Sequence, residues 1–127
     1  MDSKLYLTIA AIVAILYGIG FVLIPANLVA LYGVKPDPNV ILNIQFFGAA
    51  LIGLGVIFWL ARNFADWAAV RGVLIGAVVG DAIGLLVNLW GTMQGLLNGL
   101  AWSSTIVYVL LLLGALYCLA TGSRKLA

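Results

Sequence analysis

Four long apolar runs, separated by short polar segments, dominate the chain. They occupy about residues 5–24, 40–60, 68–90 and 98–120. A helix needs about 20 residues to cross the hydrocarbon core of a bilayer, and each run has that length. None of the runs alternates with period two as a barrel strand would, and a helix pairs its backbone polar groups internally. The pattern predicts an all-α polytopic membrane protein, a single four-transmembrane-helix bundle over residues 1–127.

Capping residues predict where the helices begin and end. Pro25 can open a short helix, "PANLVALYG", that ends at Gly33, and we expect it to lie at the membrane interface after the first span. Asp37 and Asp66 are placed to cap the second and third spans, and Gly122 is expected to end the fourth. The first run is longer than the apolar part of a signal peptide, so we interpret it as a retained span.

The distribution of basic residues predicts the orientation. With four spans, the N-terminus, the connection between the second and third spans and the C-terminus share one side, which holds five basic residues against Lys35 on the other. The excess of Lys and Arg marks the cytoplasmic side. We therefore expect an integral protein of the bacterial inner (cytoplasmic) membrane with both termini in the cytoplasm. The basic residues on that side are Lys4, Arg62, Arg71, Arg124 and Lys125.

Composition narrows the chemistry. Hydrophobic residues make up 65% of the chain and charged residues 8%, so lipid is the expected solvent and the bilayer the first partner. A net charge of +2 without a basic patch argues against a nucleic-acid partner. Without histidine and with a single cysteine, the chain lacks the groups for most metal sites, haem ligation or a disulfide, so we expect no metal and no cofactor. The same shortage of nucleophile and base pairs argues against an enzyme.

Asp81 lies near the middle of the third run. An acid at mid-membrane costs about 2.5 to 3.5 kcal/mol, against about 0.3 to 0.6 kcal/mol gained per large apolar residue, so the helix inserts but Asp81 should face the bundle. On a helix, Asn88 lies about 20° from Asp81 and Gly84 about 60° away. We expect Asp81 to accept a hydrogen bond from Gln45, Asn88, Ser104 or Tyr108. The complete candidate polar cluster is Asp81, Gln45, Asn88, Ser104, Tyr108 and Asn43.

Two interpretations of this cluster remain open. It can be a polar staple that fixes which helices pack and in what register. It can also be a site, open to the outer face, for a proton, a small ligand or a lipid headgroup.

Glycines on two spans predict close helix packing. In the third run they recur at every fourth position, a spacing that lets the backbone of a neighbouring helix approach. In the second run two glycines share the face of Gln45. The partner helix can belong to the same chain or to another. The candidate packing residues are Gly72, Gly76, Gly80, Gly84, Gly48 and Gly55.

Two segments carry a family resemblance. They are "NIQFFGAALIGLGVIFWLARN", residues 43–63, and "GLLNGLAW", residues 95–102, on either side of the third span. The pattern resembles small four-span bacterial membrane proteins of the DoxX-like type, in which the second span opens with a polar or charged residue and continues with a G-x-x-x-x-G-x-G run. In those proteins an arginine often stands at the position that Gln45 occupies in this chain. Any role of that arginine is therefore not carried over to this protein. The resemblance implies a membrane location and no specific chemistry.

Three functional hypotheses follow. The favoured one is a non-enzymatic accessory or assembly subunit whose glycine face packs against a larger membrane complex or a second copy. The second is a small oligomeric transporter or proton-coupled carrier centred on Asp81. The third is a protein that binds lipid, quinone or pigment between its helices.

Overall fold

The computed structural model describes residues 2–126, with side chains described for residues 2–122, and all elements in this part are helices. Four of them are long and apolar enough to cross a membrane. A short helix follows the first, so the predicted all-α bundle with a short helix after the first span is confirmed. The helices are α1 (Ser3–Leu23), α2 (Pro25–Leu31), α3 (Pro38–Ala61), α4 (Trp67–Met93) and α5 (Ala101–Leu126).

Local capping explains most helix boundaries. The Asp37 carboxylate accepts hydrogen bonds from the backbone N–H groups of residues 39 and 40 at 3.0 Å, and Asp66 caps α4 in the same manner. Asp2 caps α1 by accepting from the backbone N–H of Leu5 at 2.8 Å. After α2 the chain turns at Gly33, whose φ of 79° favours glycine. The predicted caps of α3 and α4 are therefore confirmed.

The end of α5 differs from the prediction. Gly122 does not end the helix, which continues to Leu126. Glycine costs about 1 kcal/mol within a helix, and packing can offset that cost. A Cβ on Gly122 would lie 2.6 Å from the Trp67 ring, so the missing side chain lets α5 pass close to the start of α4.

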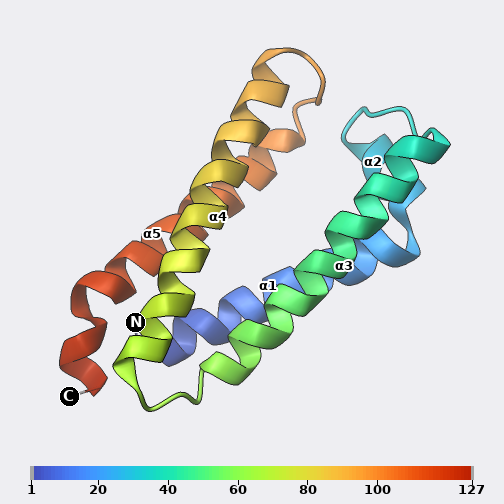
Figure 1. The fold of residues 1–127 in the computed structure, drawn as a ribbon. Coiled ribbons are helices and arrows are strands. Elements are labelled where there is room, and N and C mark those ends of the chain that lie inside the picture. Colours follow the sequence, from blue (N-terminus) through green and yellow to red (C-terminus); the bar gives the residue numbers. More distant parts are fainter. Residues whose placement is uncertain (1, 127) are drawn as a thin grey trace.

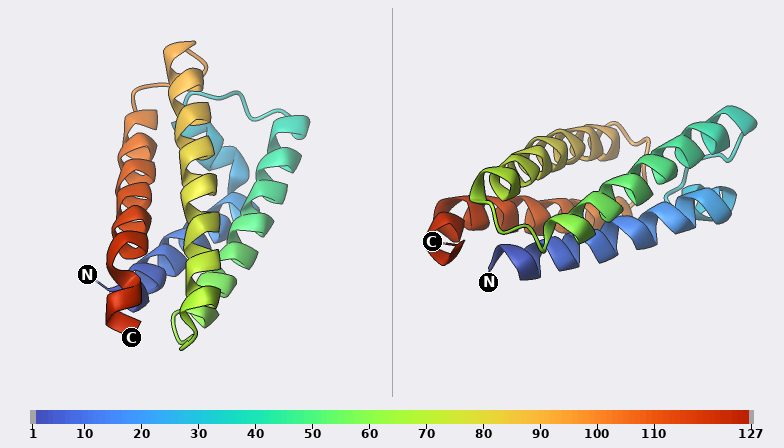
Figure 2. Two further views of the ribbon diagram at one scale, coloured as in Figure 1. Left: turned by 60° about the vertical axis from the view of Figure 1, so that its left-hand side comes forward. Right: turned by 60° about the horizontal axis from the view of Figure 1, so that its bottom comes forward.

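The helices associate as two pairs. α1 packs along α3, and α4 packs along α5, whereas α3 and α4 contact each other only slightly (Figure 1). The pairs converge at the end that carries both termini and the α3–α4 turn, and they spread apart toward α2 and the α4–α5 loop (Figure 2). We call these the inner end and the outer end.

The core of the molecule lies at the inner end, where all four long helices meet. Leu7 and Leu74 are among the most deeply buried side chains. Many of the other members are alanines, whose small side chains let the helix backbones approach closely. The buried cluster consists of Tyr6, Leu7, Ala10, Ala11, Phe58, Ala61, Val70, Leu74, Ala77, Ala115 and Cys118.

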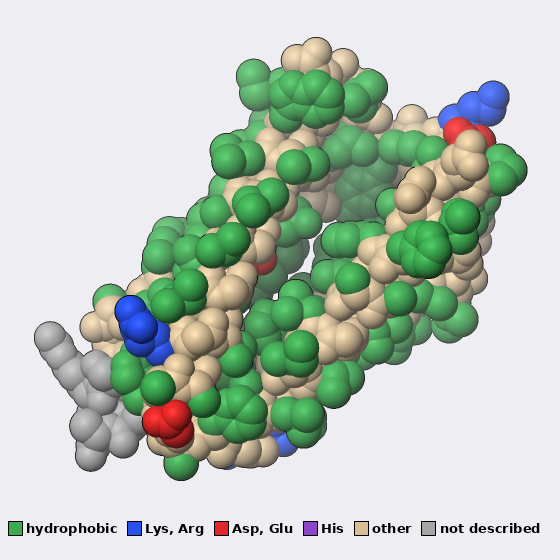
Figure 3. Space-filling view, viewed as in Figure 1, with side chains coloured by type: hydrophobic (Ala, Val, Ile, Leu, Met, Phe, Trp, Pro, Cys, Tyr) green, Lys and Arg blue, Asp and Glu red, His purple; other side chains and the backbone are tan. Residues whose placement is uncertain are grey.

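The outer end is bridged at its tip. The Tyr32 hydroxyl, just after α2, lies 2.9 Å from the Ser104 hydroxyl of α5. In the α4–α5 loop, the Asn98 side chain donates to the carbonyl of Leu31 at 2.8 Å, and its backbone N–H donates to the carbonyl of Tyr32. Between this bridge and the core, the space-filling view shows a hollow between the two pairs (Figure 3). We refer to it as the inter-pair hollow.

Candidate functional site

Asp81 lies on the core-facing side of α4, one turn beyond the last core residue. Leu74 is fully buried, Ala77 is 5% exposed, and Asp81 follows at the same helical spacing but is only half-buried. The carboxyl therefore stands where the packed core gives way to the inter-pair hollow. Figure 3 shows an acidic surface within this hollow. The prediction that Asp81 faces the bundle agrees with this position.

Two tyrosines from the neighbouring helices pack near the part of α4 that carries Asp81. Tyr6 of α1 belongs to the same core cluster as Ala77, one turn before Asp81, and Tyr108 of α5 packs at Gly84, three residues after it. The Tyr6 hydroxyl donates to the carbonyl of Leu111 at 3.0 Å and so joins α1 to α5. The Tyr108 ring packs where a Cβ on Gly84 would lie, 2.5 Å from a ring carbon. The absence of a side chain at Gly84 thus brings Tyr108 against α4 beside the carboxyl.

Further hydroxyl groups extend from this point toward the outer tip. Tyr17 of α1, Tyr108 of α5 and Tyr32 are each half-buried. Tyr32 meets Ser104 in the bridge already described. Half-buried tyrosines from both helix pairs therefore lie in the outer half of the bundle, where Tyr32 and Ser104 form the bridge.

The expected hydrogen bond to Asp81 is not formed by any of its four candidate donors. The Asn88 amide instead donates to the Thr105 hydroxyl at 2.7 Å and to the carbonyl of Ala101 at 3.2 Å. Ser104 is paired with Tyr32. Tyr108 approaches Asp81, but no hydrogen bond between them is present within the part of the chain that the structure describes.

The polar residues of α3 lie apart from Asp81. Gln45 donates to the carbonyl of Val22 at 3.1 Å, across the α1–α3 interface. Asn43 is exposed and donates to the carbonyl of Asn39 in its own helix at 3.0 Å. The prediction that Gln45 and Asn43 form one cluster with Asp81 is therefore wrong. The reason is that α3 packs on α1 and has little contact with α4.

The glycines divide into two groups. Gly48 and Gly55 lie against α1, where an added Cβ would come 2.8 Å from the carbonyl oxygen of Gly18 and 2.5 Å from the Ile15 side chain, respectively. With Gly84, they pack helices together as expected. The other three, at positions 72, 76 and 80, have nothing within 4 Å of an added Cβ and are exposed. No described residue packs against these three positions, and a contact with another chain stays a prediction.

Three tyrosines, one in the core and two in the outer half of the bundle, were not among the candidates from the sequence. Tyr6 and Tyr17 are eleven residues apart, which places them about 20° from each other around α1. That spacing marks one polar face of an otherwise apolar helix and could have identified both. Tyr32 carried no such signal, because its position depends on the turn after α2.

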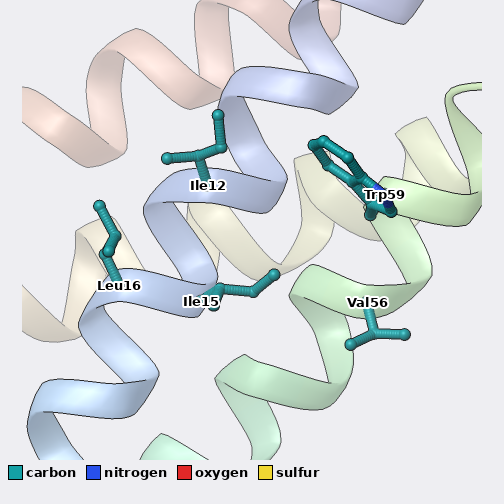
Figure 4. A pocket seen from close by; sticks show the side chains of 5 residues that line it. All are labelled: Ile12, Ile15, Leu16, Val56 and Trp59. Carbon is teal, nitrogen blue, oxygen red and sulfur yellow. The ribbon is translucent and has the colours of Figure 1, made fainter.

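A second concavity lies on the α1–α3 pair (Figure 4). It has a volume of about 360 Å³ and is formed by aliphatic side chains of both helices and one indole ring. Its outer members are exposed on a face that the lipid would cover, so it is a groove suited to acyl chains rather than a polar site. The lining residues are Ile12, Ile15, Leu16, Val56 and Trp59.

Comparison with protein-family models, with curated proteins and with solved structures gives no match. The resemblance to DoxX-like proteins therefore stays a prediction.

Proposed function

We propose that this small integral membrane protein takes a lipid-soluble small molecule from the bilayer into the inter-pair hollow. The position of Asp81 carries the proposal: its carboxyl faces the hollow, one turn beyond the core, without a hydrogen bond from the described residues predicted to supply one. An acidic group within a membrane span is costly and usually marks a ligand or ion pathway. A polar staple would instead have bound Asp81 to the neighbouring amides and hydroxyls.

The arrangement of the helices supplies a route from the lipid. α3 and α4 contact each other only slightly, so the two pairs stand apart along much of their length (Figures 1 and 2). The inner end is filled by the core and the outer tip is crossed by the Tyr32–Ser104 bridge. A lateral path between α3 and α4 is thus the natural approach for an apolar molecule. The role is binding or carrying rather than catalysis, because one carboxyl and several tyrosine hydroxyls do not make a nucleophile with its base.

Native mass spectrometry of the protein, purified in mild detergent from its own membrane, tests this proposal. We expect a small molecule to be retained by the wild type and lost in Asp81→Leu, which removes both the charge and the hydrogen-bonding atoms while favouring insertion into lipid. Asp37→Asn, a change of one charge at an exposed helix cap, should retain it. Retention of the same mass by Asp81→Leu, or a wild type that carries no bound molecule, contradicts the proposal.

A second role, as an accessory or assembly subunit, is favoured by one observation. Gly72, Gly76 and Gly80 form an exposed backbone stripe on α4 that none of the described side chains covers. Such a stripe suits close packing of a helix from a larger membrane complex or a second copy. We expect Gly76→Leu to abolish recovery of the associated protein after crosslinking in membranes. Gly53→Leu, at an open glycine outside the stripe, should leave it intact, and equal recovery with both variants contradicts the role.

We also propose that both termini lie in the cytoplasm of a bacterial inner membrane. The two termini and the α3–α4 turn share the inner end (Figure 1), and Lys4, Arg62 and Arg71 belong to that end. The outer end carries Lys35. This asymmetry follows the positive-inside rule.

A further inference from the structure

We infer that the inter-pair hollow selects a lipophilic organic cation, a molecule with an amine or quaternary ammonium (or phosphonium) centre and an apolar body. The inference rests on the proposed function and names the class of molecule that the hollow takes. It follows from the charge, the aromatic rings and the lateral access at Asp81 taken together.

The first argument is charge. The basic residues with described side chains stand at helix ends or in connections: Lys4 begins α1, Lys35 precedes α3, Arg62 follows it, and Arg71 is near the start of α4. None is at the depth of Asp81, in the middle of α4. Opposite charges attract far more strongly in a low-dielectric interior than in water. A cation that arrives from the lipid therefore supplies the counter-charge that the helices do not.

The second argument is the aromatic surroundings of the carboxyl. The Tyr108 ring packs against α4 at Gly84, three residues beyond Asp81, and it is half-buried. The faces of aromatic rings attract cations, and a site that combines such rings with a carboxylate binds alkylated ammonium groups well. Tyr6 is 3% exposed and its hydroxyl donates to the carbonyl of Leu111, so it stays part of the core, and the half-buried Tyr108 is the ring that a ligand can reach.

The third argument excludes other charged species. Inorganic cations such as Ca²⁺ require six or more oxygen ligands, and the described residues contain no group of three or more acidic, histidine or cysteine side chains. An anion would be repelled by Asp81. A hydrophilic cation would have to leave water to pass between α3 and α4, whereas an apolar body makes that path favourable.

Equilibrium dialysis of the purified protein against matched hydrophobic ions tests the inference. Tetraphenylphosphonium and tetraphenylborate have similar size and shape and opposite charge, and triphenylphosphine oxide is a neutral relative. We expect saturable binding of tetraphenylphosphonium, weakened at least about tenfold in Asp81→Asn because the buried counter-charge is lost. Asp37→Asn should bind as the wild type does, and tetraphenylborate should show no saturable binding.

Asp81→Glu keeps the charge and should keep the binding of tetraphenylphosphonium, which separates loss of charge from damage to the fold. Equal binding of the cation and of triphenylphosphine oxide, unaffected by Asp81→Asn, would overturn the cation inference while leaving a hollow that binds small molecules. Absence of saturable binding by any probe, together with a wild type that carries no small molecule in native mass spectrometry, would overturn both. Preference for tetraphenylborate would also overturn the inference.

Discussion

The inner and outer ends of the bundle differ in how the same four helices meet. At the inner end, alanines and a few larger apolar residues fill the space between all four, and Leu7, Leu74 and Ala115 are completely or almost completely buried. At the outer end, the helices remain in two pairs with polar and aromatic groups between them. Lipid is as apolar as leucine, so no hydrophobic force closes the outer end. Complementary shape therefore decides where the bundle closes.

Hydrogen bonds reinforce this difference. Gln45 binds α3 to α1, and Asn88 binds α4 to α5, so both act within a pair. The side-chain bonds between the pairs lie at the edges of the hollow: that of Tyr6 next to the core, and those of Tyr32 with Ser104 and of Asn98 with Leu31 at the outer tip. The hollow is thus a bounded feature of the fold, and each of its edges can be altered separately.

Gly55→Leu should cause the largest loss of stability. An added Cβ would lie 2.5 Å from Ile15 and 3.1 Å from the carbonyl oxygen of Ala11, so α1 and α3 would have to separate. We expect a loss of about 3 kcal/mol, the upper end of the usual cost of overpacking. Thermal or SDS unfolding in detergent measures it. Gly53→Leu on the same helix meets open space and should change little, and equal losses would contradict close packing of this pair.

Leu74→Ala should cost less, about 2 kcal/mol, the lower end of the range for soluble cores, because in lipid only packing contacts are lost. Leu74 is fully buried at the meeting point of the helices. Its neighbour Ile75 is 39% exposed, so Ile75→Ala is the matched control and should be nearly neutral. The same unfolding assay compares them. If the two variants lose the same amount, the inner end is no more tightly packed than the lipid-facing surface.

Local signals account for what the sequence predicted well. The length of the apolar runs, and aspartates such as Asp37 and Asp66 before them, depend on neighbouring residues alone. The inward position of Asp81 follows from the cost of a carboxyl in hydrocarbon. These arguments require no knowledge of which helix packs on which.

The contacts that the sequence did not predict depend on which helices pair with each other. Gln45 faces α1 instead of Asp81 because α3 lies along α1, and nothing in the apolar pattern distinguishes α1 from α4 as its neighbour. The glycines at every fourth position of α4 were ambiguous in the same way, because their spacing does not show which of them face a helix of this chain. Gly84 packs inside the chain, whereas Gly76 faces outward. Tyr32, at the end of α2, meets Ser104, which is 72 residues further along the chain, and no local pattern indicates that contact.

Asn88→Ala should weaken the α4–α5 pair by about 1 kcal/mol. The side chain donates to the Thr105 hydroxyl and to a carbonyl of α5, and hydrogen bonds between membrane helices contribute about 0.6 kcal/mol on average, with a maximum of about 1.7. Unfolding in detergent measures the change. Asn43→Ala removes a bond within a single helix and should be close to neutral. A larger effect at Asn43 would contradict the assignment of Asn88 to the pair interface.

Tyr32→Phe should have the smallest effect on stability and a clear effect on shape. It removes the 2.9 Å contact with Ser104 but leaves the two bonds of Asn98, so we expect a loss of about 0.6 kcal/mol and a wider outer tip. Spin labels on cysteines at Asn39 and Gln94, in a Cys118→Ala background, report the distance between the pairs. Ser103→Ala is the control, because the Ser103 hydroxyl donates locally, to the carbonyl of Leu100 just before α5. An unchanged distance in Tyr32→Phe would mean that Asn98 alone sets the separation of the pairs at the outer tip. The loop that carries Asn98, and not the hydroxyl pair of Tyr32 and Ser104, would then close the tip of the hollow.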